Sequence, residues 1–139
     1  MDEEIRNLLC QIYANTKKKL QEHWRPTIEQ YGDIFQLVRW RPGDQLYPPH
    51  ADAAYEDGSP HPFSYREYAA IIYLNDSYSG GQLYFSKLDF VPEITTGTLA
   101  IFPGTLEYTH GVTPVRSGMR YTIAGFFTSQ KSYANQYLI

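Results

Sequence analysis

The 139 residues are enough for one domain with a single hydrophobic core and too few for a second core. A hydrophobic content of 42% and a mean hydropathy of −0.45 are typical of a globular chain in water. The net charge of −3 argues against general electrostatic attraction to nucleic acid or to an anionic membrane. The single cysteine, Cys10, excludes an internal disulfide framework and a thiolate-rich metal site.

The first segment has the pattern of one amphipathic helix over residues 3–24. Apolar side chains recur there at helical spacing, and acidic residues at the start suit the positive end of a helix. Arg25-Pro26 is expected to end the helical region, because proline disfavours α geometry in the residue before it. The charged N-terminus and the lack of a long apolar run predict no signal peptide and no membrane span, so a cytoplasmic location is expected.

From residue 33 the pattern changes to short β-type runs separated by turn clusters. The turn clusters include residues 77–81 and 116–118, both rich in Gly and Ser. The predicted strands cover residues 33–40, 68–75, 81–85, 98–103 and 120–127. One covering helix followed by many short strands favours a mainly β jelly roll, with its β core at about 33–128 in a single domain over 1–139. The polar segment 53–67 is long for a loop, which suggests a lid over a binding site.

Two prolines precede a His-x-Asp triplet formed by His50 and Asp52. In an extended backbone residues i and i+2 share a face, so both side chains could hold one metal ion. Such triplets also arise by chance at solvated loop ends. A metal ion held on one face needs a third ligand besides these two. His110 stands between two strand-like runs and is the best remaining histidine, since His23 and His61 lie at a helix end and in a polar loop. Two histidines and one carboxylate can form a facial triad that leaves positions open on ferrous iron.

Arg120 follows His110 at the start of the last predicted strand. Its planar guanidinium can bind a carboxylate with two parallel hydrogen bonds, as an acidic co-substrate of iron would require. Each residue also has an ordinary structural explanation: Arg120 could pair with a surface glutamate, and His110 could be a core histidine. The joint arrangement is harder to explain in that way.

The order His50-x-Asp52, then His110, then "GVTPVRSGMR" ending at Arg120, resembles the 2-oxoglutarate- and iron(II)-dependent dioxygenases of the prolyl hydroxylase superfamily. The wording "FSYREYAAIIYLND" followed by "GGQLYF" is especially similar to the catalytic domain of prolyl 3-hydroxylases. The resemblance covers roughly residues 34–128. It departs from the common family pattern at Ala69 and at Gln82-Leu83, which puts the fit of the substrate in doubt rather than iron binding.

The resemblance implies a double-stranded β-helix and a role for each matching residue. His50, Asp52 and His110 match the iron ligands, and Arg120 matches the residue that holds the distal carboxylate of 2-oxoglutarate. Three further residues match positions near the co-substrate or the substrate, although core tyrosines and a surface salt bridge are their alternatives. They are Tyr73 and Tyr47, near the co-substrate, and Arg66, near the mouth of the site.

The implied activity is hydroxylation of a C–H bond, with release of succinate and CO2 from 2-oxoglutarate and O2. The cofactor is Fe(II), and ascorbate stays open as an auxiliary reductant. A prolyl residue in a peptide or protein is the leading substrate, on resemblance alone. A free amino acid or small metabolite, a non-catalytic jelly-roll binding module and a zinc-loaded hydrolase are the alternatives. A nucleic-acid demethylase is disfavoured because Phe126 stands where those enzymes carry a second arginine. The sequence leaves the oligomeric state open.

Overall fold

The computed structural model describes residues 2–138. Helix α1 spans Glu3–His23, which confirms the predicted helix to within one residue. Its N-terminus is capped by Asp2, whose carboxylate accepts hydrogen bonds from the backbone N–H groups of Glu4 and Ile5 at 2.9 and 3.2 Å. An aspartate at this position satisfies donors that have no partner inside the helix, and its negative charge suits the helix dipole.

The rest of the chain is mainly β, as predicted. The strands are β1 (Tyr31–Trp40), β2 (Leu46–His50), β3 (Tyr68–Tyr73), β4 (Ser79–Gly80), β5 (Leu83–Phe85), β6 (Leu99–Pro103), β7 (His110–Val112), β8 (Val115–Ser117) and β9 (Arg120–Thr128). Short 3-10 helices are η1 (Leu106–Tyr108), η2 (Lys131–Tyr133) and η3 (Gln136–Leu138). All described strand pairs are antiparallel, which suits the short connections between them.

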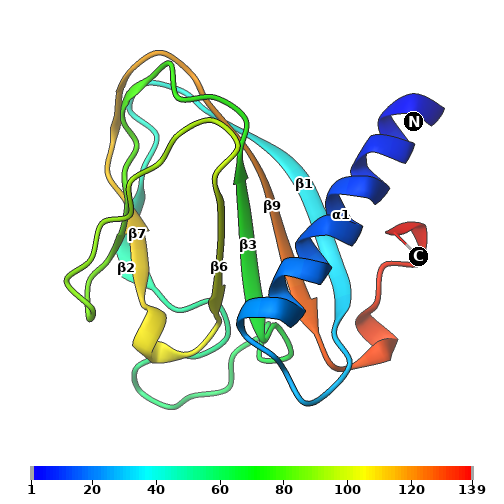
Figure 1. Cartoon of the computed structure of the whole chain (residues 1–139). Helices are drawn as coiled ribbons and strands as arrows, with labels where there is room; N and C mark the ends of the chain where they lie inside the picture. The colour runs from blue at the N-terminus through cyan, green and yellow to red at the C-terminus, as the bar shows by residue number, and fades with distance from the viewer. Residues whose placement is uncertain (1, 139) are drawn as a thin grey trace.

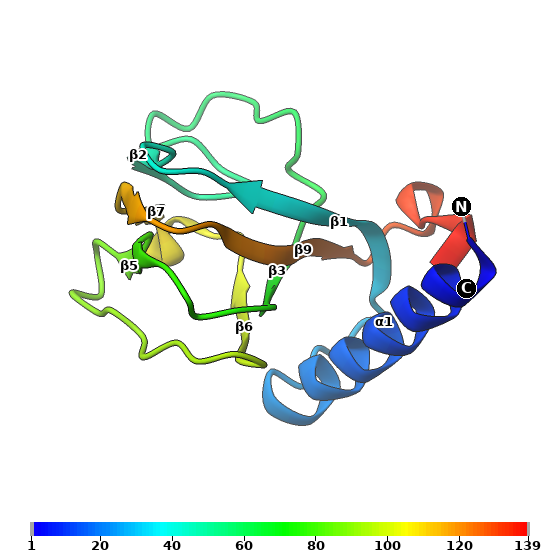
Figure 2. The ribbon, with the colours of Figure 1, turned by 90° about the horizontal axis from the view of Figure 1, so that it is seen from above.

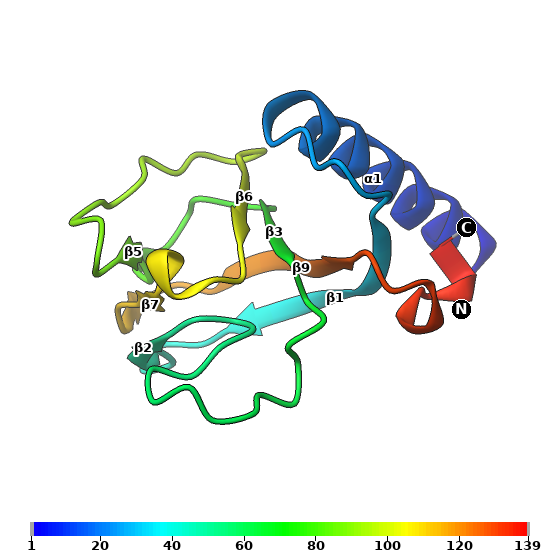
Figure 3. The ribbon, with the colours of Figure 1, turned by 90° about the horizontal axis from the view of Figure 1, so that it is seen from below.

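Two sheets face each other across the interior, and α1 covers the outside of the larger one (Figure 1). The main sheet has the order β1-β9-β3-β6, and the opposing sheet has the order β2-β7-β5, with β4 and β8 paired beside it. Figures 2 and 3 show this layering from above and from below, with the C-terminal segment beside α1. This arrangement of facing antiparallel sheets is the predicted jelly roll.

Side chains along the strands of the main sheet point alternately to its two faces, and each face packs into a separate hydrophobic core. On β9, Arg120, Thr122, Ala124 and Phe126 line the interior between the sheets, whereas Phe127 packs toward α1. Side chains of a strand point alternately to opposite faces, so one strand can serve both layers. The core between the sheets contains Ala69, Leu83, Phe85, Phe102 and Val112. The core under the helix contains Tyr13, Leu20, Ala70 and Phe127.

The structure corrects the strand assignment at four places, one of which is residues 110–112, which were not assigned as a strand and form β7. Residues 46–50, which were not assigned as a strand, form β2 and pair with β7. The expected turns at 77–81 and 116–118 are shorter than predicted, because Ser79–Gly80 form β4 and Arg116 and Ser117 belong to β8. Gly80 and Gly118 have φ of 71° and 76°, a left-handed geometry that glycine adopts without steric cost. With glycine at these positions, the chain can turn directly at the end of each short strand.

The loop 53–67 connects β2 to β3 (Figure 3), and Arg66 near its end contacts Asp33 of β1. It contains local hydrogen bonds, including that from the N–H of Gly58 to the carbonyl oxygen of Tyr55 at 3.1 Å. Its expected closure over a substrate stays a prediction. Among residues 2–138, no helix combines the length and the apolar character needed to cross a membrane.

The helix layer yields the first testable prediction. Leu20 is fully buried between α1 and the main sheet, whereas Leu8 of the same helix is 55% exposed. We expect Leu20→Ala to lower the free energy of unfolding by about 2–5 kcal/mol, because it removes buried methyl groups and leaves a cavity. Leu8→Ala should change it by less than about 0.5 kcal/mol. Urea unfolding followed by circular dichroism measures both, and equal stabilities of the two variants would contradict this account of the helix layer.

Candidate metal centre

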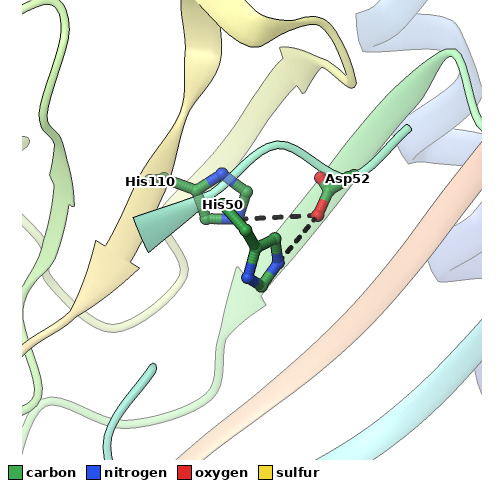
Figure 4. A group of neighbouring side chains, drawn as sticks. All are labelled: His50, Asp52 and His110. Atoms are coloured by element: carbon green, nitrogen blue, oxygen red, sulfur yellow. Dashed lines mark ion pairs between the residues drawn. The ribbon is translucent and has the colours of Figure 1, made fainter. Parts of the chain in front are cut away.

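The pairing of β2 with β7 brings two histidines of distant sequence position side by side. His50 is the last residue of β2 and lies opposite His110, the first residue of β7, with ring centroids 5.2 Å apart. Asp52 follows β2 after one buried alanine, and the chain there turns its carboxylate back toward both rings (Figure 4). The sequence triplet and the distant histidine therefore meet at one end of the opposing sheet.

The three side chains present their metal-binding atoms to one point. Oδ1 of Asp52 lies 3.5 Å from Nε2 of His50 and 3.6 Å from Nε2 of His110, and one ligand atom from each residue lies within 4.8 Å of the others. Figure 4 shows both imidazoles directed at the carboxylate. The His110 and Asp52 side chains are 7% and 9% exposed, whereas that of His50 is 47% exposed, so the group opens to solvent on the His50 side.

The surroundings of His110 prepare its Nε2 atom for a metal. Its Nδ1 donates a hydrogen bond to the carbonyl oxygen of Tyr108 at 2.9 Å, which leaves the lone pair on Nε2. Burial lowers the pKa of His110, although Asp52 opposes this by raising it. A neutral imidazole is the form that binds metal ions.

The carboxylate of Asp52 has an incomplete set of partners. Its Oδ2 atom is buried and has no hydrogen-bond partner within residues 2–138. Leaving a buried carboxylate oxygen unpaired costs free energy, which a bound cation would recover. Two imidazole nitrogens and one carboxylate are also the donor set of the facial triad for ferrous iron. The residues present therefore fit a divalent metal such as Fe(II).

A cavity of about 320 Å³ extends from these three residues into the space between the sheets. Most of its wall is apolar, with Trp40, Val112 and Phe126 among the lining side chains. Arg120 also lines the cavity and is only 1% exposed. A largely apolar cavity with few polar groups is the usual form of a small-molecule site.

The Arg120 guanidinium has aromatic neighbours but no carboxylate partner among the described residues. Its centre lies 4.7 Å from the Trp40 ring and 5.1 Å from the Tyr73 ring, and Nη2 donates to the Tyr73 hydroxyl at 3.3 Å. The Nε atom of Arg120 is also buried, and it has no hydrogen-bond partner among residues 2–138. Burial raises the pKa of Tyr73 even though Arg120 opposes this, so the hydroxyl keeps its proton. A buried cation without a counter-charge is costly, and the cavity thus has a place for an anion.

The two other predicted residues lie elsewhere. Tyr47 is 74% exposed and points away from the cavity that its neighbour Leu46 lines, because adjacent side chains of a strand face opposite ways. The geometry therefore gives no support to the predicted contact of Tyr47 with a co-substrate. Arg66 donates from Nε to Asp33 at 2.8 Å, which is the salt bridge considered as its alternative role. Its predicted contact with a substrate stays a prediction.

The sequence analysis missed Trp40 and Phe126 as cavity residues. Trp40 lies opposite Arg120 in the register of β1 and β9, and Phe126 lies on the same face of β9 as Arg120. The i, i+2 alternation from Arg120 could have indicated Phe126. Trp40 could not be found in this way, because its position depends on the register between two strands far apart in the sequence.

The curated relatives of this chain are prolyl hydroxylases. The chain is 30% identical over 105 residues to prolyl 3-hydroxylase 2 from Homo sapiens, covering 67% of this chain and 15% of that protein. It is 36% identical over 74 residues to prolyl 3-hydroxylase 1 from Gallus gallus, covering 50% of this chain and 10% of that protein. The chain therefore matches only a small part of the length of these relatives.

Solved structures share the fold. The 2-oxoglutarate complex of the viral collagen prolyl hydroxylase from Paramecium Bursaria Chlorella virus-1 aligns with a TM-score of 0.70 and 22% identity, over 86% of this chain and 72% of that one. A prolyl-4-hydroxylase from Pseudomonas putida aligns with a TM-score of 0.65 and 21% identity, over 94% and 70% of the two chains. These likenesses support the double-stranded β-helix.

Family membership rests on a match to most of the chain. The model of the 2OG-Fe(II) oxygenase superfamily matches residues 35–128, a range that begins inside β1, ends with β9 and contains all three members of the His-Asp-His group. This family uses Fe(II), 2-oxoglutarate and O2, and the donor set and the buried arginine described above fit those requirements. The chain belongs to the 2OG-Fe(II) oxygenase superfamily.

Proposed function

We propose that this chain is a 2-oxoglutarate- and Fe(II)-dependent dioxygenase that hydroxylates a prolyl residue in a peptide or protein. The observation that carries the proposal is one cavity that holds both a His-Asp-His group and a buried arginine without a carboxylate partner among the described residues. A non-catalytic jelly roll is the alternative, and absence of succinate production in the presence of iron would favour it. The choice of prolyl substrate is supported by the names of the relatives, prolyl 3-hydroxylases 1 and 2.

In this proposal His50, Asp52 and His110 would hold the iron, because two imidazoles and one carboxylate are the donor set of the facial triad for Fe(II). Bound Fe(II), with 2-oxoglutarate and O2, supplies the oxidising power for C–H hydroxylation and yields succinate and CO2. Asp52 contributes the only negative charge among the ligands. The hydrogen bond of His110 to the Tyr108 carbonyl fixes the direction of one imidazole.

Arg120 binds the distal carboxylate of 2-oxoglutarate at the inner end of the cavity. The Trp40 ring limits where the guanidinium can lie, and the Tyr73 hydroxyl is hydrogen-bonded to it. The hydroxyl keeps its proton and can therefore donate to the same carboxylate. The apolar wall excludes water, which strengthens each of these charge interactions. The position of the bound co-substrate is thus set before the substrate arrives.

A hydroxylase of free proline or of another small metabolite would use the same centre. The two activities differ in whether the substrate must extend beyond the cavity. Comparing product formation from a blocked prolyl peptide and from free proline separates them. Turnover of the peptide with none of free proline supports the proposal, and the reverse result contradicts it. Ascorbate belongs in both assays as the proposed reductant that keeps iron in the ferrous state.

The ligand assignment predicts the behaviour of Asp52→Ala. We expect iron affinity to fall by about 100-fold or more, with loss of 2-oxoglutarate turnover, because the variant removes the only anionic ligand. Anaerobic titration with Fe(II) measures the affinity directly. Glu107→Ala removes an exposed carboxylate outside the cavity and should bind iron as the parent does. Parent-like iron affinity in a folded Asp52→Ala protein would show that Asp52 is not a ligand.

The anion site predicts a graded response at Arg120. Arg120→Ala should weaken 2-oxoglutarate binding by at least ~30-fold, since a buried carboxylate would lose its charged partner. Arg120→Lys should weaken it less, because the charge remains while the planar fork is lost.

These affinities are measured on the iron-loaded protein with dioxygen excluded, so that binding is separated from turnover. Arg39 is exposed and lies one position before Trp40, which lines the cavity, on the opposite face of β1. Arg39→Ala is therefore the matched control and should bind 2-oxoglutarate normally. If Arg120→Ala folds, binds iron and holds 2-oxoglutarate as tightly as the parent, the anion site is wrongly assigned.

A further inference from the structure

A second cavity lies where the edge strands β5 and β6 end the two sheets. We call it the side pocket; it has a volume of about 370 Å³, and its wall includes Phe85, Leu88, Phe90, Ile94, Ala100 and Phe102. Part of this wall comes from the connection between β5 and β6, which forms a wide loop in Figure 2. Trp24 also lines the side pocket, and its indole N–H donates to the carbonyl oxygen of Ile101 at 3.0 Å, which holds the ring in place.

The wall of the side pocket suits a small apolar molecule. None of the described residues that line it carries a charged side chain. The Trp24 N–H is used by Ile101, and the Thr98 hydroxyl accepts a hydrogen bond from the N–H of Thr95 at 3.1 Å. A ligand with a charged head group would therefore find no counter-charge in this wall. Apolar cavities in proteins instead take up small apolar molecules such as xenon.

One aromatic side chain separates the side pocket from the cavity of the metal centre. Phe102 lines both cavities and is only 3% exposed. Its ring centroid lies 4.8 Å from that of His110 and 5.0 Å from that of Phe85. Core side chains are well packed on average but still change rotamer transiently. Displacement of Phe102 alone would therefore join the side pocket to the cavity beside His110.

The other access to the metal centre is used by larger reactants. The group opens to solvent on the side of His50, whose side chain is 47% exposed. In the proposed function, 2-oxoglutarate and a prolyl residue share a cavity of about 320 Å³, and the rest of the peptide extends out of it. The bound peptide would then cover this opening. The side pocket lies behind Phe102 and stays open to solvent, because Leu88 and Phe90 in its wall are 42% and 54% exposed.

We infer that the side pocket takes up O2 and delivers it to the metal centre past Phe102. The inference rests on the proposed function, since O2 is the third reactant of that activity. O2 is small and apolar, so its transfer from water to an apolar wall is favourable. The side pocket thus gives O2 a path that is separate from the one that 2-oxoglutarate and the peptide use.

Two variants change the side pocket without touching the metal centre. Ala100→Leu fills it from β6, and Leu88→Trp narrows its exposed mouth; neither residue lines the cavity of the metal centre. Ala14→Leu is the matched control, because it is the same substitution at an exposed position of α1. Thermal unfolding verifies that each variant is folded. Anaerobic titrations should give parent-like affinities for Fe(II) and 2-oxoglutarate in all three.

Xenon tests the side pocket without any reaction, because dry apolar cavities bind it. Crystals of the parent and the variants are pressurised with xenon, and anomalous scattering locates the bound atoms. We expect xenon in the side pocket of the parent and of Ala14→Leu, and none there in Ala100→Leu. A parent side pocket without xenon would overturn the inference.

Gas entry is measured on the iron- and 2-oxoglutarate-loaded protein with a blocked prolyl peptide present. Stopped-flow mixing with nitric oxide, a diatomic analogue of O2, follows entry without turnover, and the KM for O2 follows it during turnover. We expect Ala100→Leu and Leu88→Trp to slow nitric oxide binding and to raise the KM for O2, each by roughly threefold or more, with an unchanged kcat at saturating O2. Ala14→Leu should behave as the parent.

The outcomes separate this inference from the proposed function. Parent-like nitric oxide binding and a parent-like KM for O2 in both Ala100→Leu and Leu88→Trp would overturn the inference, even if the parent hydroxylates the peptide. Xenon in the side pocket and slower nitric oxide binding in both variants, in a protein that hydroxylates no prolyl peptide, would keep the inference and reject the prolyl substrate.

Discussion

The buried guanidinium of Arg120 is the interaction on which the interior depends. Burying a cation that is only 1% exposed costs desolvation free energy, which neighbouring groups must offset. The two aromatic rings and one hydroxyl around Arg120 offset only part of this cost. The space left beside it is therefore selective for an anion. Asp52, which lines the same cavity, has the reverse requirement, because its buried Oδ2 atom has no partner among the described residues and suits a cation. One cavity therefore carries a group suited to a cation and a group suited to an anion.

The two sheets supply these two groups separately. The histidines and the aspartate come from β2, β7 and the residues just after β2, whereas Arg120 starts β9 in the main sheet. Helix α1 contributes no side chain to the cavity, but it buries the outer face of the main sheet that carries Arg120. The chemistry is thus placed between two layers, and the helix stabilises one of them from outside.

The sequence allowed the fold class and the charged site residues to be predicted, but not the register. The helix followed from its spacing, and His50, Asp52, His110 and Arg120 followed from residue chemistry and family resemblance. Strand β2 was missed because a run with two prolines does not look like a strand, although it pairs with β7 beside the cavity. The geometry does not support the predicted role of Tyr47, whose side chain is exposed. Closeness in the sequence to His50 does not determine which face of β2 a side chain takes.

Because His50 and His110 meet only when β2 pairs with β7, the metal centre exists only in the folded chain. A metal ion that binds the folded state and not the unfolded one stabilises the fold by mass action, in proportion to the logarithm of its free concentration. The proposed ligands join segments far apart in the sequence, so a bound ion would act as a cross-link between β2 and β7. Iron supply and the lifetime of the folded protein would then be thermodynamically linked, and starvation for iron would act on the amount of this protein as well as on its chemistry.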